Sequence, residues 1–348
     1  MELLYCVHII AFLFRNDDYN TVEYGGPLMG RYIIRRVLQA IPLLFLVSIA
    51  MFGLIHLMPG GPVGVFLNPH LSAAGRQNLE ARFGLNDPLP IQYVKWLLNA
   101  LQGDFGFSFL TNQPVLQVLG EHFPATLELF TVALLVALII AIILGTISAM
   151  RQNTITDYTV TTLSYFGLSM PVFFFALILQ EIFGVILHWL PTSGSSTAGV
   201  TFDAFNAAWD NFNHLLLPMI VLATGFIAGW SRYLRSSMIE VRKQDYIRTA
   251  QAKGVGTVAV LTRHALRNAV IPLVTAVAID FGAIAGGAAI TETVFAWPGV
   301  GRLFLASLDA RDYPVLLAML VIAAASVIIA NLIADLLYAV IDPRIRYS

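Results

Sequence analysis

Charged residues and cysteine are both scarce in this chain. Asp, Glu, Lys and Arg make up 12% of its 348 residues, whereas hydrophobic residues make up 57% and the mean hydropathy is +0.75. A soluble core of this size has no need of such uniform apolarity, so the composition predicts an all-α polytopic membrane protein. The only cysteine, Cys6, excludes a disulfide within the chain. The formal net charge of −1 gives no indication of a nucleic-acid partner.

Motifs for chemistry are missing as well. No Gly-x-x-x-x-Gly-Lys-Ser/Thr stretch exists, so the chain has no recognisable phosphate-binding loop of its own. Its seven histidines are scattered and no two sit four residues apart on one helix, which argues against a metal site. No nucleophile elbow frames a serine. We therefore expect neither a cofactor nor a metal in this chain, and we do not expect an enzyme.

What the sequence does contain is six long apolar runs. They cover residues 37–57, 127–150, 163–187, 215–233, 271–290 and 315–340. Each is about 19–26 residues long, which suits a helix that crosses about 30 Å of hydrocarbon with ordinary tilt. The distribution of basic residues then predicts the topology. If both termini share one side, 14 of the 20 Lys and Arg lie there and five lie opposite, so both termini are expected to be cytoplasmic.

The segment 232–270, between the fourth and fifth runs, is the most basic part of the chain. It carries eight Lys or Arg against Glu240 and Asp245, or about +6. A helix capped by Ser236 or Ser237 is expected first, ending near Gly254, and a second helix is expected after it. Periodicity alone leaves two interpretations open: a compact knob for a partner protein, or a basic loop held by anionic lipid.

Two stretches of this segment carry a family resemblance. Residues 244–254 read Gln-Asp-Tyr-Ile-Arg-Thr-Ala-Gln-Ala-Lys-Gly, and residues 263–272 read Arg-His-Ala-Leu-Arg-Asn-Ala-Val-Ile-Pro. They resemble the EAA loop of binding-protein-dependent ABC importer permeases, and most closely the dipeptide/oligopeptide branch. The resemblance implies the type I importer fold and a short coupling helix that docks on a cytoplasmic ATPase. The implied contact residues are Tyr246, Arg248, Thr249, Ala250, Ala252, Lys253 and Gly254.

The same resemblance implies the rest of an assembly. The chain would pair with a second, homologous permease subunit in the bacterial inner membrane. Two ATPase subunits would hold ATP and Mg, and an extracytoplasmic binding protein would deliver a peptide. The cargo stays open among a dipeptide, a longer peptide, glutathione, a nickel chelate and an oligosaccharide, which relatives of this branch carry.

The resemblance begins at Met29 and covers essentially all that follows. Residues 1–28 are a doubtful leader: we expect the true start at Met29, with an interfacial segment as the alternative. Next come the cytoplasmic start and first span (29–58) and a large extracytoplasmic segment (59–123), with helices expected at 72–83 and 91–101. The transmembrane domain (124–341) is expected to begin with a helix started by Pro124, and 342–348 is a cytoplasmic tail.

Three polar side chains inside the apolar runs attract attention. Asp280 lies near the middle of the fifth run, where an ionised carboxylate facing lipid would cost about 2.5 kcal/mol or more. It is expected either to line the translocation path or to bond to a neighbouring helix. Gln180 and Glu181 lie toward the outer end of the third run, as further path candidates. Pro171 in the same run allows a kink.

These carboxylates also support an alternative function. Asp280 and Glu181 could carry protons in a secondary transporter that needs no ATPase, and a structural membrane protein is a third possibility. Uptake by this chain alone, driven by a pH gradient, would favour the secondary transporter.

A turn rich in glycine separates the last two runs. It reads Glu-Thr-Val-Phe-Ala-Trp-Pro-Gly-Val-Gly-Arg-Leu over residues 292–303, and it too matches the peptide branch. Trp297, Pro298, Gly299 and Arg302 are candidates for docking the binding protein. A plain extracellular hairpin is the competing interpretation.

Overall fold

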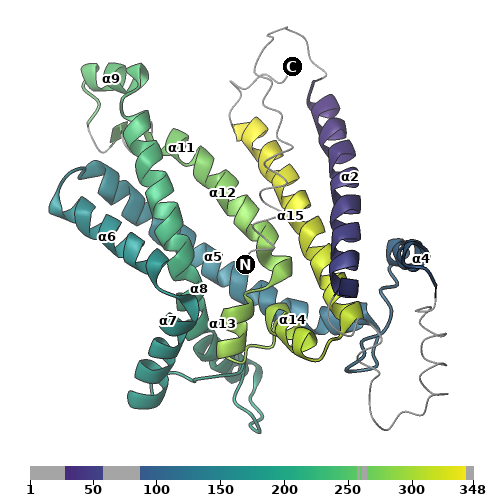
Figure 1. Cartoon of the computed structure of the whole chain (residues 1–348). Helices are drawn as coiled ribbons and strands as arrows, with labels where there is room; N and C mark the ends of the chain where they lie inside the picture. The colour runs from purple at the N-terminus through teal and green to yellow at the C-terminus, as the bar shows by residue number, and fades with distance from the viewer. Residues whose placement is uncertain (1–27, 58–86, 257–258, 261–264, 342–348) are drawn as a thin grey trace. The chain divides into compact units, whose positions relative to one another are not determined.

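The computed structural model describes residues 28–57, 87–256, 259–260 and 265–341. These residues form helices and no strand apart from one isolated bridge between Phe107 and Pro114 (Figure 1). The helices are, in order, α2 (Leu28–Leu57), α4 (Leu89–Leu101), α5 (Val115–Met150), α6 (Ile155–Ser169), α7 (Val172–Leu179), the π-helix η2 (Gln180–Ile186), α8 (Ala204–Val241), α9 (Asp245–Ala252), α11 (Leu266–Ala269), α12 (Ile271–Gly282), the 3-10 helix η4 (Ala283–Gly286), α13 (Ala289–Val294), α14 (Val300–Asp309) and α15 (Tyr313–Ile341).

Several of these helices are long and apolar enough to cross a bilayer. Four qualify in the described part of the chain: Val115–Met150, Ala204–Val241, Leu266–Gly286 and Tyr313–Ala334. A fifth span results if Ile155–Ser169 and Val172–Ile186, which meet at 101°, are counted together. Residues Leu38–Leu54 of α2 form a shorter apolar helix. The chain is therefore a multi-pass helical membrane protein.

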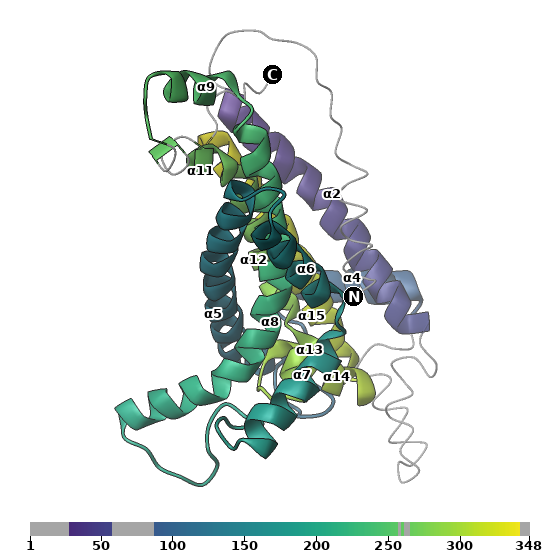
Figure 2. The same ribbon diagram turned by 90° about the vertical axis from the view of Figure 1, so that its left-hand side faces the viewer.

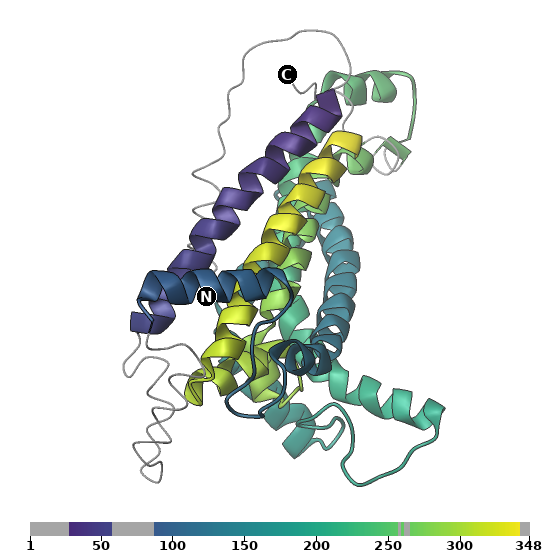
Figure 3. The ribbon, with the colours of Figure 1, turned by 90° about the vertical axis from the view of Figure 1, so that its right-hand side faces the viewer.

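The chain divides into two compact units. One contains residues up to Glu121 together with Ala306–Leu332 and Pro343–Ser348, and the other contains His122–Leu305 and Ile333–Asp342. In the first unit, α4 lies against the end of α2 (Figure 3). The hydroxyls of Ser48 and Tyr93 are 2.7 Å apart, and a ring nitrogen of His56 is 3.2 Å from the amide oxygen of Gln92. No residue of α4 is buried, and its apolar side chains at 89, 91, 94, 98 and 101 are exposed.

The first unit also holds a buried carboxylate at the start of α15. Asp312 is 1% exposed and accepts hydrogen bonds from the Ser108 hydroxyl at 2.5 Å and from the Phe109 amide at 3.0 Å. The loop before α5 is thus bonded to the N-terminus of α15, within this unit.

The core of the second unit is built from α5, α8 and α12. Buried side chains of all three share one apolar cluster, which includes Leu129, Leu234 and Leu273. α6 also packs along α8 (Figure 2). Small residues bring these helices close together, because a Cβ atom on Gly145 of α5 would lie 2.8 Å from the Ser231 carbonyl oxygen of α8.

Three expectations about helix ends are wrong. Pro124 does not start a helix: α5 begins nine residues earlier, at Val115. Neither Ser236 nor Ser237 caps a new helix, because α8 runs without interruption from Ala204 to Val241. The third span is not one helix, because α6 ends at Ser169 and α7 begins after Pro171.

Other expectations fare differently. The helix expected at 91–101 is confirmed as α4, which begins at Leu89 because Pro88 precedes it and Pro90 fits the first turn. The kink allowed by Pro171 is also confirmed. The helix expected at 72–83, the leader 1–28 and the tail 342–348 lie wholly or almost wholly outside the described residues. Of the second helix expected in the segment 232–270, residues 257–258 and 261–264 lie outside them, and the described part includes α11.

Candidate functional site

The short helix α9 follows α8 after a three-residue turn. Gln244 precedes it in an extended conformation, and its carbonyl accepts the backbone amides of Ile247 at 3.1 Å and Arg248 at 3.4 Å. The helix ends at Ala252, and Gly254 then adopts a φ of +78°, which glycine reaches at little cost. The expectation that Gly254 ends a helix is confirmed. The single helix expected from Ser236 onward is instead the end of α8 plus α9.

One side of α9 is fastened to the second unit. Ile247 is 1% exposed and belongs to the apolar cluster of that unit, and Tyr246 and Ala250 pack against the same cluster. The Tyr246 hydroxyl also accepts a hydrogen bond from the Asn268 amide at 2.9 Å. α9 is therefore held in place by its apolar side, as expected of an amphipathic helix.

The other side of α9 is open. Arg248, Thr249, Ala252, Lys253 and Gly254 are all exposed. Arg248 and Asp245 lie 3.8 Å apart and are 73% and 97% exposed, so this ion pair adds little stability. Five of the seven implied contact residues thus face outward on one small surface, while Tyr246 and Ala250 position the helix.

The glycine-rich turn at 292–303 encloses a buried carboxylate. Glu292 is 0% exposed, and its carboxylate accepts the Thr126 hydroxyl at 2.9 Å and the amides of Ala288 and Arg302 at 3.2 and 3.0 Å. The Thr126 hydroxyl in turn accepts the Val300 amide at 2.7 Å. The turn is therefore folded around Glu292 and bonded to α5.

Backbone segments of this turn and of residues 287–289, just before it, approach so closely that only glycine fits. A Cβ atom on Gly287 would lie 2.4 Å from the backbone nitrogen of Gly301, and one on Gly301 would lie 2.5 Å from that of Ala289. A Cβ on Gly299 would meet the Glu292 carboxylate and the Thr126 hydroxyl at 2.4 Å.

The four docking candidates of this turn differ in exposure. Trp297 is 0% exposed and its indole nitrogen donates to the Ala125 carbonyl at 2.8 Å, so its side chain is part of the interior. Gly299 is buried and Pro298 is half-buried. Arg302 is exposed and donates to the Ala296 carbonyl at 2.8 Å. Arg302 is the one charged group of the four that presents a surface.

Asp280 has a partner on a neighbouring helix. The indole nitrogen of Trp230, on α8, donates to its carboxylate at 2.8 Å. Trp230 itself is 2% exposed and stacks on Phe226 with ring centroids 5.2 Å apart. The structure thus contains the interhelical hydrogen bond that was one of the two expectations for Asp280.

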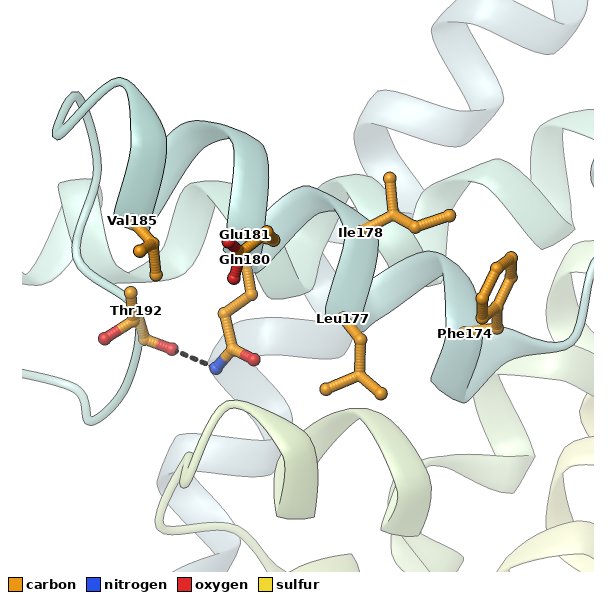
Figure 4. Close-up of a pocket in the computed structure, with 7 residues that line it drawn as sticks. All are labelled: Phe174, Leu177, Ile178, Gln180, Glu181, Val185 and Thr192. Carbon is orange, nitrogen blue, oxygen red and sulfur yellow. Dashed lines mark hydrogen bonds between the residues drawn. The ribbon is translucent and has the colours of Figure 1, made fainter.

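Gln180 and Glu181 lie at an open cavity of about 540 Å³, which is lined by Phe174, Leu177, Ile178, Gln180, Glu181, Val185 and Thr192 (Figure 4). The Gln180 amide donates to the carbonyls of Thr192 at 2.6 Å and Val294 at 3.2 Å, so it ties the start of η2 to the following loop and to α13. Glu181 is exposed and is the one charged group in the lining. π-Helical turns such as η2 are frequent at functional sites.

The three candidates for the translocation path, Asp280, Gln180 and Glu181, do not share a contact. Asp280 bonds to α8, whereas Gln180 and Glu181 border the cavity beside η2. Within the ranges that the structure describes, no three His, Cys, Asp or Glu side chains are grouped as metal ligands would be.

Comparison with known proteins identifies the family. Residues 141–347 match the family described as "Binding-protein-dependent transport system inner membrane component", and residues 29–130 match its N-terminal family, "Binding-prot-dependent transport system membrane comp, N-term". The chain belongs to this permease family. Its members are membrane components of transport systems, and the coupling-loop resemblance of residues 244–272 agrees with that membership.

Three relatives cover nearly the whole chain. An oligopeptide transport system permease of Bacillus subtilis is 45% identical, a dipeptide transport system permease of Alkalihalophilus pseudofirmus 41%, and a glutathione transport system permease of Escherichia coli K12 37%. Each alignment covers 92% of this chain and 100% of the relative.

Sequence reasoning overlooked the residues that hold these sites together. Ile247 lies inside the quoted motif but was given no role, and Glu292 was only the first letter of another motif. Each of the two differs in polarity from its neighbours in the sequence. An isolated isoleucine in a charged segment indicates a helix face that packs on the protein, and a lone glutamate among apolar residues indicates a buried hydrogen-bond network. Thr126, which bonds to Glu292, and Ala125, which bonds to Trp297, lie more than 160 positions away from these partners, and nothing in the sequence marks them.

Proposed function

We propose that the chain is a permease subunit of an ABC importer for di- or oligopeptides. Its relatives carry oligopeptide, dipeptide and glutathione transport in their names, and α9 offers the outward face that a coupling helix needs. The observation that carries the proposal is the anchoring of α9 by Ile247, which leaves Arg248 and Lys253 free to meet an ATPase.

The proposal includes a complete assembly. A second permease completes the path, two ATPase subunits bind ATP and Mg, and an extracytoplasmic binding protein delivers the peptide. Both termini and α9 lie on the cytoplasmic side of a bacterial inner membrane. α2 supplies the first of six spans in a type I importer fold, and the bent pair of α6 with α7 and η2 supplies the third.

Named residues have separate tasks in this proposal. Tyr246, Arg248, Thr249, Ala250, Ala252, Lys253 and Gly254 form the ATPase-coupling site. Gln180, Glu181 and Asp280 belong to the translocation path, where the exposed carboxylate beside the cavity suits the protonated amine of a peptide. Arg302 makes the main contact with the binding protein, and Trp297, Pro298 and Gly299 of the same turn complete the docking site.

Transport in vesicles tests the proposal. The complete assembly is reconstituted in liposomes and offered labelled alanine peptides of two to five residues, with ATP on the ATPase side. Import that requires ATP, both ATPase subunits and the binding protein is the expected result. Import by this chain alone under a pH gradient would instead establish the proton-coupled alternative through Asp280 and Glu181.

A further inference from the structure

An ion pair between a buried aspartate and a partly exposed arginine joins α6 to α8 before the coupling helix. Asp157, on the first turn of α6, is 1% exposed and receives two hydrogen bonds from Arg235 of α8, at 2.6 Å from Nε and 2.7 Å from Nη2. The Asn153 amide donates to the same carboxylate at 2.9 Å, and the Ser148 hydroxyl of α5 donates as well. Paired, charge-assisted bonds of this kind hold orientation as well as distance.

A second arginine holds the same turn. Arg242 follows the last residue of α8, seven positions and two helical turns after Arg235, so both lie on one side of the helix. Its guanidinium donates to the Ala149 carbonyl of α5 at 2.7 Å. The end of α8 that leads into α9 is therefore fastened at two points, to Ala149 at the end of α5 and to Asp157 at the start of α6.

Farther along, α6 and α8 are in close contact. The Ser164 and Ser231 hydroxyls are 3.2 Å apart, and a Cβ atom on Gly167 would lie 3.2 Å from the Thr224 methyl group. Packing this tight, together with the ion pair, opposes sliding of α6 on α8. The two helices therefore behave as one body.

That body ends at a break. α6 stops at Ser169, Met170 is extended, and α7 leaves at 101° after Pro171. Beyond the break lie η2 and the cavity bordered by Gln180 and Glu181. Beyond the break, α7 also packs directly on α8, where Ala176 shares an apolar cluster with Leu217 and Val221. A displacement of α8 can therefore reach this region by that contact as well as through α6, whose end sets the angle at the break.

We propose that Asp157 and Arg235 are a positioning pair that carries the movement of α9 through α8 and α6 to the hinge at Met170–Pro171. Neither residue touches ATP, the ATPase or the cargo. The pair keeps α6 in step with α8, so that α7 and η2 change their angle when the coupling helix is displaced. This inference rests on the proposed function, since it needs an ATPase acting on α9.

The decisive quantity is the number of peptides imported per ATP hydrolysed. It is measured in the complete reconstituted assembly with alanine peptides, for the wild type and for Asp157→Asn, Arg235→Gln and Arg235→Lys. Lys95→Gln is the matched control, because it removes an ion pair, with Asp87 at 2.5 Å, that is exposed and remote in sequence from the coupling loop. Assembly is checked by co-purification of the ATPase subunits.

The expected result is a fall of about tenfold or more in peptides per ATP for Arg235→Gln, with the ATPase subunits still bound. Arg235→Lys, which keeps the charge but loses the paired geometry, should fall between it and the wild type. An unchanged ratio in any assembled Arg235 variant overturns the inference. Lys95→Gln should match the wild type, and an equal fall there also overturns it.

A second measurement follows the angle between α6 and α7 directly, in assemblies that retain the ATPase subunits. Spin labels are placed at the exposed positions 162 of α6 and 173 of α7 after Cys6→Ser removes the only native cysteine. ATP should change the distance between the labels in the wild type, by less in Arg235→Lys, and least in Arg235→Gln. A full change in Arg235→Lys contradicts the inference, whereas a wild type that imports nothing with ATP overturns the proposed function itself.

Discussion

The carboxylate of Glu292 and the hydroxyl of Thr126 meet at 2.9 Å inside the second unit, although 166 residues separate them along the chain. The bond connects α13, at the turn after α12 and η4, to α5. It is one of three that satisfy Glu292, and it leaves the Thr126 oxygen free to accept the Val300 amide. The turn is thus shaped from within by a polar network.

Removal of this carboxylate should destabilise the protein. Glu292→Ala leaves the buried Thr126 hydroxyl and the partly buried amides of Ala288 and Arg302 without this acceptor, and a fully buried unsatisfied group costs about 1–3 kcal/mol. We expect a clearly lower Tm in detergent, with Glu292→Gln intermediate because one amide oxygen remains. The exposed neighbour Thr293→Ala is the control and should leave Tm unchanged. Equal Tm values for the Glu292 and Thr293 variants would refute the network.

The anchor of α9 can be tested separately from its surface. Ile247→Ala removes a buried side chain and should cost about 2–5 kcal/mol, concentrated on a helix of eight residues. α9 should then detach, so we expect the ATPase subunits to be lost on purification while the permease still folds. Asp245→Asn, at a 97% exposed side chain, should retain them. Retention by Ile247→Ala would show that α9 docks without this anchor.

Two glycines of the 287–301 turn should not tolerate a methyl group. Gly287→Ala and Gly301→Ala place a Cβ within 2.4–2.5 Å of backbone atoms, which cannot move aside as a side chain can. We expect each to lower Tm and the yield of folded protein. Gly225→Ala in α8 has open space around its Cβ and should be neutral or stabilising by about 0.5–1 kcal/mol. The opposite order of stability would contradict the close approach of these backbones.

The two expected tasks of Asp280 predict different variant behaviour. If its main task is the bond to Trp230, then Trp230→Phe and Asp280→Asn should reduce stability by similar amounts, and the double variant should add little. If Asp280 also belongs to the path, as proposed, Asp280→Asn should lower ATP-driven uptake several-fold more than Trp230→Phe. Equal uptake by the two variants would remove Asp280 from the path.

Much of this fold could be predicted from the sequence, because its elements are long and locally encoded. Four of the six apolar runs coincide with helices long enough to cross a bilayer, and a fifth coincides with the bent pair that breaks at Pro171. Gly254 marked the end of α9. The wrong helix ends have local causes too. Buried Val115, Val118 and Leu119 recur at helical spacing before Pro124, and buried Leu234 and Met238 continue α8 across the two serines.

The sites were harder to predict because their partners are distant. Asp157 and Arg235 are 78 residues apart, and Trp230 and Asp280 are 50 apart, so no window of sequence contains both members. A local pattern can show that a carboxylate lies in an apolar run. Only the packing of helices decides which donor reaches it.

The exposed apolar side chains of α4 have one more consequence. A helix with such a face rests where lipid headgroups meet acyl chains. α4 contacts α2 through Ser48 and His56, so we expect that end of α2 to be held at the same depth. As an interfacial helix, α4 would then set how deeply α2 is inserted in the bilayer.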